Sequence, residues 1–210
     1  AQYYAGYNFI VSKFKSLNGK RVIFCNDSFF YLDNDKGKHI EKLLNNDFDF
    51  YSIFEVTGKE KVSPFHYSSW LFSVTEDLFF SSVFKKYFCK LLFVKNKKYA
   101  IRNGEHRLTK LILGSKFSSS AIYKQVDLNL FINKLDDLGL SKYFDYFFYF
   151  NDNSKYSIRE YLLNNLFKFH PSHYFLFFLM HVKSYPFVKK DIFFQNGIFY
   201  SQMNDIFDFI

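Results

Sequence analysis

Short apolar runs and longer segments with helical spacing alternate between residues 20 and 126. The run Arg21–Cys25 is continuously apolar after its first residue and contains β-branched residues, which is typical of a buried strand. Similar patterns predict further strands over 49–56, 67–74 and 120–126, and helices over 3–17, 37–46, 76–88 and 104–113. This alternation predicts an α/β layer structure with an open mixed sheet and flanking helices.

From residue 128 onward the pattern is mainly helical, with helices expected over 128–138, 157–168, 172–184 and 200–209. We therefore expect an α/β part over residues 1–127 and a helical C-terminal part over 128–210. The first clear strand is Val22–Cys25, so we expect some neighbouring strands of the sheet to be missing from these 210 residues. An unpaired strand edge favours association. The chain alone should form a homodimer or depend on a preceding N-terminal segment.

Composition narrows the classes of function. The net charge of +8 and the pI near 9.2 favour an anionic partner, such as a phosphate-bearing substrate or an anionic membrane surface. Nucleic acid is the least favoured partner, because the chain has no zinc-finger spacing, no RNP-like motif and no long Lys/Arg run. The 32 Phe and 17 Tyr could reflect an AT-rich codon bias, or part of them could form a stacking surface for sugars or a membrane-facing area.

The two cysteines, Cys25 and Cys89, give neither a disulfide framework nor a metal-binding quartet. Both lie in apolar runs, so we expect both to be buried. The most apolar stretch, Tyr174–Val182, is too short to span a bilayer, and no signal peptide opens the chain. These features predict a cytoplasmic protein.

A carboxylate ends the first predicted strand, in Asn26-Asp27-Ser28. The carboxyl ends of strands form the ligand-binding rim of many α/β sheets. There Asp27 could hold Mg²⁺ or Mn²⁺ against a diphosphate, because hard cations prefer oxygen ligands and keep several waters. The alternative is an Asx turn, in which Asn26 or Asp27 bonds its own backbone.

Two further groups of polar residues have the chemistry of a binding or catalytic site. His66, Ser69 and Trp70 enter one predicted strand and could stack on and hydrogen-bond a sugar; the alternative is simple packing. Gly104-Glu105 begins a predicted helix, where Gly104 lets a ligand approach and Glu105 could act as a general base. Here the alternative is compensation of the helix dipole by Glu105.

The order of these groups resembles that of the rhamnan synthesis F family of polysaccharide-synthesising glycosyltransferases. Asn26-Asp27-Ser28 looks like the family's NDS element, and Asn103-Gly104-Glu105 with Leu108-Thr109 looks like its NGE-x-x-LT element. The other similar blocks, in chain order, are Phe48–Ser52, His66–Leu71, Ser81–Phe88, His170–Tyr174 and Tyr185–Asp191. One departure is Asn8, which stands where the family's GYDFG stretch has Asp.

The resemblance implies a GT-A-like fold and transfer of a sugar from a nucleotide-sugar donor to a growing lipopolysaccharide, capsule or cell-wall glycan. It makes Glu105 and Asp27 the expected catalytic residues, with Asp27 also the expected ligand of Mg²⁺ or Mn²⁺. The expected substrate-binding residues are Asn26, Ser28, His66, Ser69, Trp70, Arg102, Gly104 and Lys189. The acceptor would be lipid-linked or a glycan, at the cytoplasmic side of the inner membrane. The alternative function is a non-catalytic glycan- or partner-binding module, which Asn8 and the missing strands favour.

Overall fold

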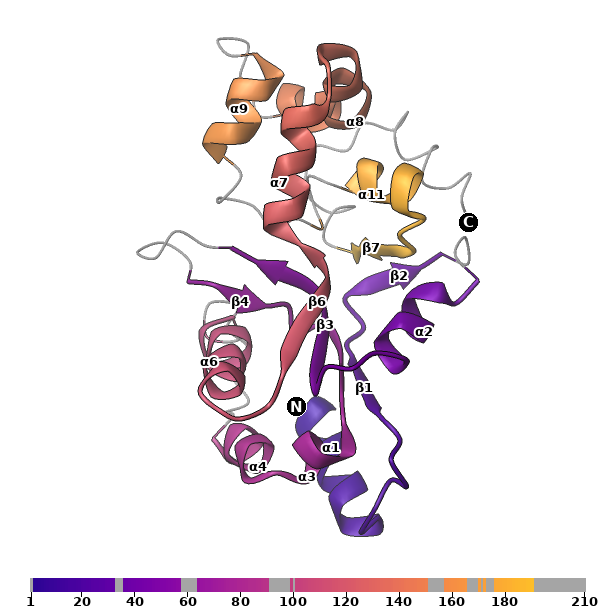
Figure 1. Cartoon of the computed structure of the whole chain (residues 1–210), viewed down its shortest axis with the longest axis vertical. Coiled ribbons are helices and arrows are strands. Elements are labelled where there is room, and N and C mark those ends of the chain that lie inside the picture. Colours follow the sequence, from indigo (N-terminus) through magenta and orange to yellow (C-terminus); the bar gives the residue numbers. More distant parts are fainter. Residues whose placement is uncertain are drawn as a thin grey trace. The chain divides into compact units, whose positions relative to one another are not determined.

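The computed structural model describes residues 2–32, 36–57, 64–90, 99, 101–150, 157–165, 170, 172 and 176–190. The chain forms two compact units (Figure 1). The first contains Ala1–Asn26 and Ile40–Lys124, and the second contains Asp27–His39 and Gln125–Ile210. The chain thus enters its second unit at Gln125, close to the boundary expected at residue 127, while the segment 27–39 groups with the C-terminal residues. The helix expected over 200–209 lies outside the described residues.

An open mixed sheet of five strands organises the first unit (Figure 1). The strands are β1 (Val22–Cys25), β3 (Phe50–Val56), β4 (His66–Tyr67), β5 (Leu71–Val74) and β6 (Ser119–Lys124). On one side β3 pairs antiparallel with both β4 and β5, and on the other it pairs parallel with β6. β5 also pairs antiparallel with β1. The expected α/β class and the open mixed sheet are confirmed.

The strand expected over 67–74 is interrupted, because β4 and β5 run along the same side of β3 with a break between them. Ser52 pairs with Phe72 and Glu55 pairs with Tyr67, so three steps along β3 face five steps along its partner. Two residues are therefore extra within the segment 68–71. Such a bulge re-aims side chains that a regular strand would keep in register.

Helices flank this sheet: α1 (Gln2–Lys13), α2 (Lys38–Leu44), α3 (Glu76–Phe80), α4 (Ser82–Cys89) and α6 (Arg107–Leu113), with a π-helix, η2 (Ile101–His106), leading directly into α6. The single helix expected over 76–88 is divided at Ser81. Ser81 leaves the helical conformation with ψ 157°, and its hydroxyl donates to the Leu78 carbonyl (2.7 Å) and accepts from the Phe84 N–H (3.3 Å). Ser81 thereby ends α3 and caps α4.

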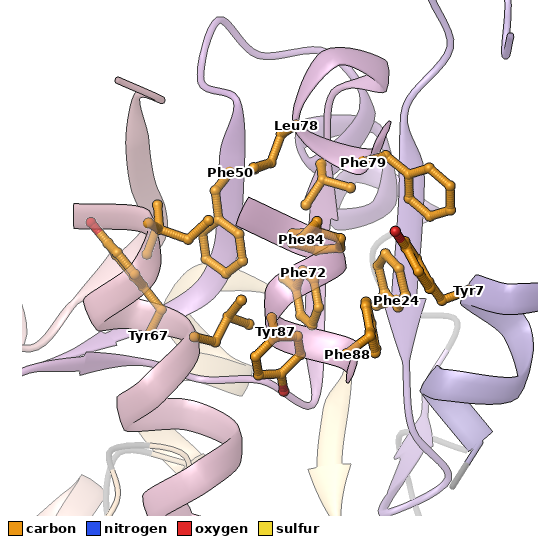
Figure 2. Close-up of a cluster of buried hydrophobic side chains, with 14 residues drawn as sticks. Tyr7, Phe24, Phe50, Tyr67, Phe72, Leu78, Phe79, Phe84, Tyr87 and Phe88 are labelled. Carbon is orange, nitrogen blue, oxygen red and sulfur yellow. The ribbon is translucent and has the colours of Figure 1, made fainter. Parts of the chain in front are cut away.

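Aromatic rings fill the core between the sheet and helices α1, α3 and α4 (Figure 2). The rings of Phe24 and Phe72 stack at 4.9 Å between centroids, and Tyr7 stacks on Phe88 at 4.4 Å. Burial of such rings is a large source of stability. Within this unit, at least these aromatic residues serve packing rather than ligand binding.

The prediction that both cysteines are buried is wrong, since Cys25 and Cys89 are both exposed. Cys25 follows the buried Phe24 on β1, and alternation along the strand turns its side chain to the other face. Cys89 ends α4 and lies outside the face formed by Phe84, Tyr87 and Phe88 at i, i+3 and i+4.

The second unit contains helices α7 (Gln125–Lys134), α8 (Asp137–Phe150), α9 (Ile158–Asn165) and α11 (Leu176–Lys183), and strands β2 (Phe29–Tyr31) and β7 (Phe187–Lys189). β2 and β7 form an antiparallel two-stranded sheet. The Arg159 guanidinium donates to the carbonyls of Ile132 and Leu135, and so satisfies the end of α7. Among the described residues no helix has the length and apolar character needed to cross a membrane.

Candidate functional site

Three residues that the sequence singled out separately meet in the first unit: His66, Ser69 and Glu105. The carboxylate oxygen Oε1 of Glu105 accepts hydrogen bonds from the Ser69 N–H (3.0 Å) and the Ser69 hydroxyl (3.3 Å). The other oxygen, Oε2, lies 3.7 Å from Nε2 of His66. The imidazole and carboxylate thus form a pair whose carboxylate is oriented from the backbone.

Two irregular elements bring these side chains together. The bulge between β4 and β5 contains Ser69, and the π-helix η2 contains Glu105. Isolated π-helical turns and bulges are both frequent beside functional sites. A bond from the Tyr67 N–H to the Thr109 hydroxyl (2.9 Å) ties β4 to the helix that follows η2. The pair therefore sits on a rigid frame rather than on a free loop.

The His66–Glu105 pair is sheltered from water. The side chains of His66 and Glu105 are 6% and 16% exposed. Nδ1 of His66 lies 2.9 Å from the Pro64 carbonyl oxygen, which can only accept, so this nitrogen carries a hydrogen. His66 can consequently gain or lose a proton only at Nε2, the atom that faces Glu105.

His106, which the sequence analysis did not select, adjoins this pair. Its ring centroid lies 4.7 Å from that of His66. Burial lowers the pKa of His106, and His66 lowers it further, while Glu105 partly opposes both. Burial also raises the pKa of Tyr87, with a further contribution from Glu105. The only signal in the sequence was the position of His106 directly after Glu105.

The lowered pKa of His106 predicts a loss of stability in mild acid. The unfolded chain binds a proton on this ring more readily than the folded chain, so protonation favours unfolding as the pH falls through the ordinary histidine range. We expect the free energy of unfolding to fall between about pH 7.5 and 5.5, and to fall less in His106→Gln. Urea titrations at both pH values measure this difference. Equal losses in the two proteins would contradict the prediction.

The other residues expected in this unit take different positions. Trp70 is 3% exposed and packs near the ring of Phe54, so a sugar could stack on it only if the ring were uncovered. Gly104 is buried inside η2, Arg102 is exposed, and the Asn26 N–H donates to the Trp70 carbonyl at 3.0 Å. None of these contacts gives Trp70, Arg102 or Asn26 a direct bond to Glu105.

A second pair of expected residues meets in the second unit. The ammonium group of Lys189 donates to the Ser28 hydroxyl at 3.1 Å, although 161 positions separate the two residues. The Lys190 N–H donates to the Ser28 carbonyl at 2.9 Å. Asp27 precedes this pair and is exposed. The β2–β7 ladder explains the meeting, because it pairs Phe29 with Lys189.

The expected metal site has one protein carboxylate in Asp27. Within the described part of the chain, no group of three or more His, Cys, Asp or Glu side chains is placed to hold a metal ion. The expected Mg²⁺ or Mn²⁺ site needs only one or two carboxylates beside water ligands, so it stays a prediction, and we assign no chemical step to a metal.

An open groove of about 950 Å³ occurs elsewhere in the first unit and contains none of the expected site residues. It is lined in part by Asp49, Glu76 and Lys116. Two of its three carboxylates serve the fold: Asp49 accepts from Ser118 and Thr75, and Glu76 accepts from the segment 16–19. Hydrogen bonds from this segment, with that of Ser16 the largest cause, lower the pKa of Glu76. The groove therefore does not replace the His66–Glu105 cluster as the candidate site.

No protein-family model, curated protein sequence or solved structure matches this chain. The functional conclusion therefore depends on the residues and their geometry.

Proposed function

We propose that the chain is a glycosyltransferase of GT-A-like fold that moves a sugar from a nucleotide-sugar donor to a growing bacterial surface polysaccharide. The observation that carries the proposal is the meeting of His66, Ser69 and Glu105 in one sheltered cluster. Each of these residues lies in a segment that resembles a block of the rhamnan synthesis F family. If these three residues had only a structural role, packing alone would be enough. The cluster instead presents an oriented carboxylate beside an imidazole.

In this proposal Glu105 is the general base of a single displacement. Oε2 takes the proton of the acceptor hydroxyl while the acceptor oxygen bonds to the anomeric carbon of the donor. The bond from that carbon to the diphosphate breaks, and the nucleoside diphosphate leaves with the bonding electrons. Ser69 fixes Oε1 through two hydrogen bonds, so that Oε2 keeps its direction.

The charge of the chain agrees with such substrates. The donor carries a diphosphate, and lipid-linked acceptors lie at an anionic membrane surface, so a net charge of +8 favours both. Lys189, held by Ser28 in the second unit, is a candidate contact for phosphate. The proposed location is the cytoplasm, peripheral to the inner membrane.

A second candidate is a non-catalytic glycan- or partner-binding module, and the burial of the site favours it. Trp70 is 3% exposed, and Glu105 is bonded to the bulge through Oε1. In this alternative the carboxylate is a clamp that joins η2 to the sheet. Replacement of Glu105 would then lower stability without affecting any turnover.

Thermal unfolding in the presence of UDP-, GDP- and dTDP-sugars tests donor binding. The donors should be used up to about 1 mM, the upper end of typical Michaelis constants, with and without Mg²⁺ or Mn²⁺. A donor at a concentration about 100 times its dissociation constant stabilises a protein by about 2.7 kcal/mol. We expect one nucleotide class to raise the melting temperature, and its free nucleoside diphosphate to do so as well. Equal shifts with every nucleotide would point to charge alone.

Asp27→Ala tests the expected contact with the donor diphosphate. Asp27 is exposed, so its loss should change the free energy of unfolding by no more than about 0.5 kcal/mol. We expect sugar transfer to be abolished while the melting temperature stays nearly constant. The exposed Asp47→Ala, outside the site, is the matched control. Full activity in Asp27→Ala would remove Asp27 from the site, and a large loss of stability would favour the Asx turn.

A further inference from the structure

The His66–Glu105 pair can exchange protons through only one ring nitrogen, Nε2 of His66. Nδ1 of His66 is committed to the Pro64 carbonyl, and Nε2 faces the carboxylate. Both side chains are largely buried, at 6% and 16% exposure. A base in such a place must be reprotonated and deprotonated through a neighbouring group, because water has little direct access to it.

The ring of His106 has a different environment at each nitrogen. Nε2 has almost no accessible surface and no hydrogen-bond partner in the described part of the chain. The residue as a whole is only half-buried, and Nδ1 is not enclosed in this way. A buried polar atom without a partner is rare and requires an explanation. Since the ring lies 4.7 Å from that of His66 by centroids, proton exchange with the pair is one explanation.

We propose that His106 conducts protons between the His66–Glu105 pair and water, so that the three side chains form one proton-handling unit. A proton on Glu105 Oε2 passes to Nε2 of His66, and then to Nε2 of His106 by rotation of the His106 ring or through one water. The His106 ring releases the hydrogen on Nδ1 to solvent, so the number of protons balances. The inference rests on the proposed function only for the source of the proton, which is the acceptor hydroxyl.

The neighbouring charges leave this task to the two histidines and Glu105. Tyr87 on α4 keeps its proton at neutral pH, since burial raises its pKa. The Arg107 guanidinium donates to the Lys86 carbonyl at 2.9 Å. Glu55 lies on β3 opposite Tyr67, the residue after His66. The lowered pKa of His106 keeps its ring neutral at neutral pH and therefore able to accept a proton.

Nitrogen-15 NMR of the histidine rings in the full chain tests the conduit without any donor or acceptor. The measured quantity is the rate at which Nε2 of His66 gains a proton from water and loses it again, read from the exchange between the neutral and the protonated ring. His106→Phe fills the site but cannot carry a proton, and His106→Gln does the same while keeping a polar group. We expect both variants to slow the exchange by about an order of magnitude. His170→Asn, which replaces a histidine of the second unit, should leave the rate unchanged.

Added imidazole provides a rescue that a structural role would not show. His106→Ala removes the ring, and imidazole in solution should return the exchange rate of His66 towards the wild-type value. An unchanged rate in both His106→Phe and His106→Gln would overturn the proposal, and so would a slowed rate in the His170→Asn control. If exchange is slowed in the His106 variants but the wild type turns over no nucleotide sugar, the conduit is retained and the transferase is rejected. If turnover is lost in Glu105→Gln but the His106 variants keep the wild-type exchange rate, the transferase is retained and the conduit is rejected.

Discussion

Replacement of Glu105 by Gln should lower the rate of sugar transfer by roughly 10²–10⁴-fold, because the amide cannot take the proton of the acceptor hydroxyl. The amide oxygen can still accept both hydrogen bonds from Ser69, so the frame of the site should persist. Donor binding should be preserved, since the expected phosphate contacts lie elsewhere in the chain. Turnover and donor affinity, measured separately, test both parts of this expectation.

The matched control is Glu41→Gln, on the exposed surface of α2, which should retain full turnover. Unchanged turnover in Glu105→Gln would reduce Glu105 to a structural residue. A large drop in the melting temperature of Glu105→Gln, when the wild type itself shows no turnover, would favour the clamp described for the non-catalytic alternative. The two functions therefore predict opposite balances of stability and activity for one substitution.

Phe72→Ala should be the most destabilising substitution in the core of the first unit. Phe72 is 0% exposed and stacks on Phe24 and Phe50 at 4.9 and 5.1 Å between centroids. Truncation of a buried Phe to Ala costs about 3–5 kcal/mol, a large part of the about 5–15 kcal/mol that stabilises a typical domain. The unfolding midpoint in urea, at unchanged slope, measures the loss.

Phe9→Ala provides the control for Phe72→Ala, because Phe9 is 60% exposed on α1. The same chemical change there should alter stability by no more than about 0.5 kcal/mol. Similar losses in the two variants would show that the aromatic core in Figure 2 is not the main source of stability in this unit.

The regular parts of the fold were predictable because their patterns are local. The runs at Val22–Cys25 and Phe50–Val56 became strands β1 and β3 with nearly the expected bounds. The helix α8 was missed although it has a local signal, since Asp136 accepts from the Gly139 N–H at 2.8 Å as an N-cap residue does. Gly139 in the first turn hid the helical pattern.

The candidate site was predictable residue by residue, but its geometry was not. The residue types around His66 and Glu105 indicated a binding or catalytic site. Their meeting depends on the bulge at Ser69, and pairing with β3 defines that bulge. β3 comes earlier in the chain: the Ser52 hydroxyl, which donates to the Ser68 carbonyl, is 16 residues before it. Long-range pairing of this kind leaves no periodic trace in the sequence. For the same reason His106 was not selected.

The most direct test of the proposed function is the release of nucleoside diphosphate by the wild-type chain from a panel of UDP-, GDP- and dTDP-sugars, with and without a glycan acceptor. The account predicts release from one nucleotide class, faster with acceptor, and nearly absent in Glu105→Gln. Release that is equal in wild type and Glu105→Gln, or absent with every donor at concentrations where a donor demonstrably binds, would contradict it.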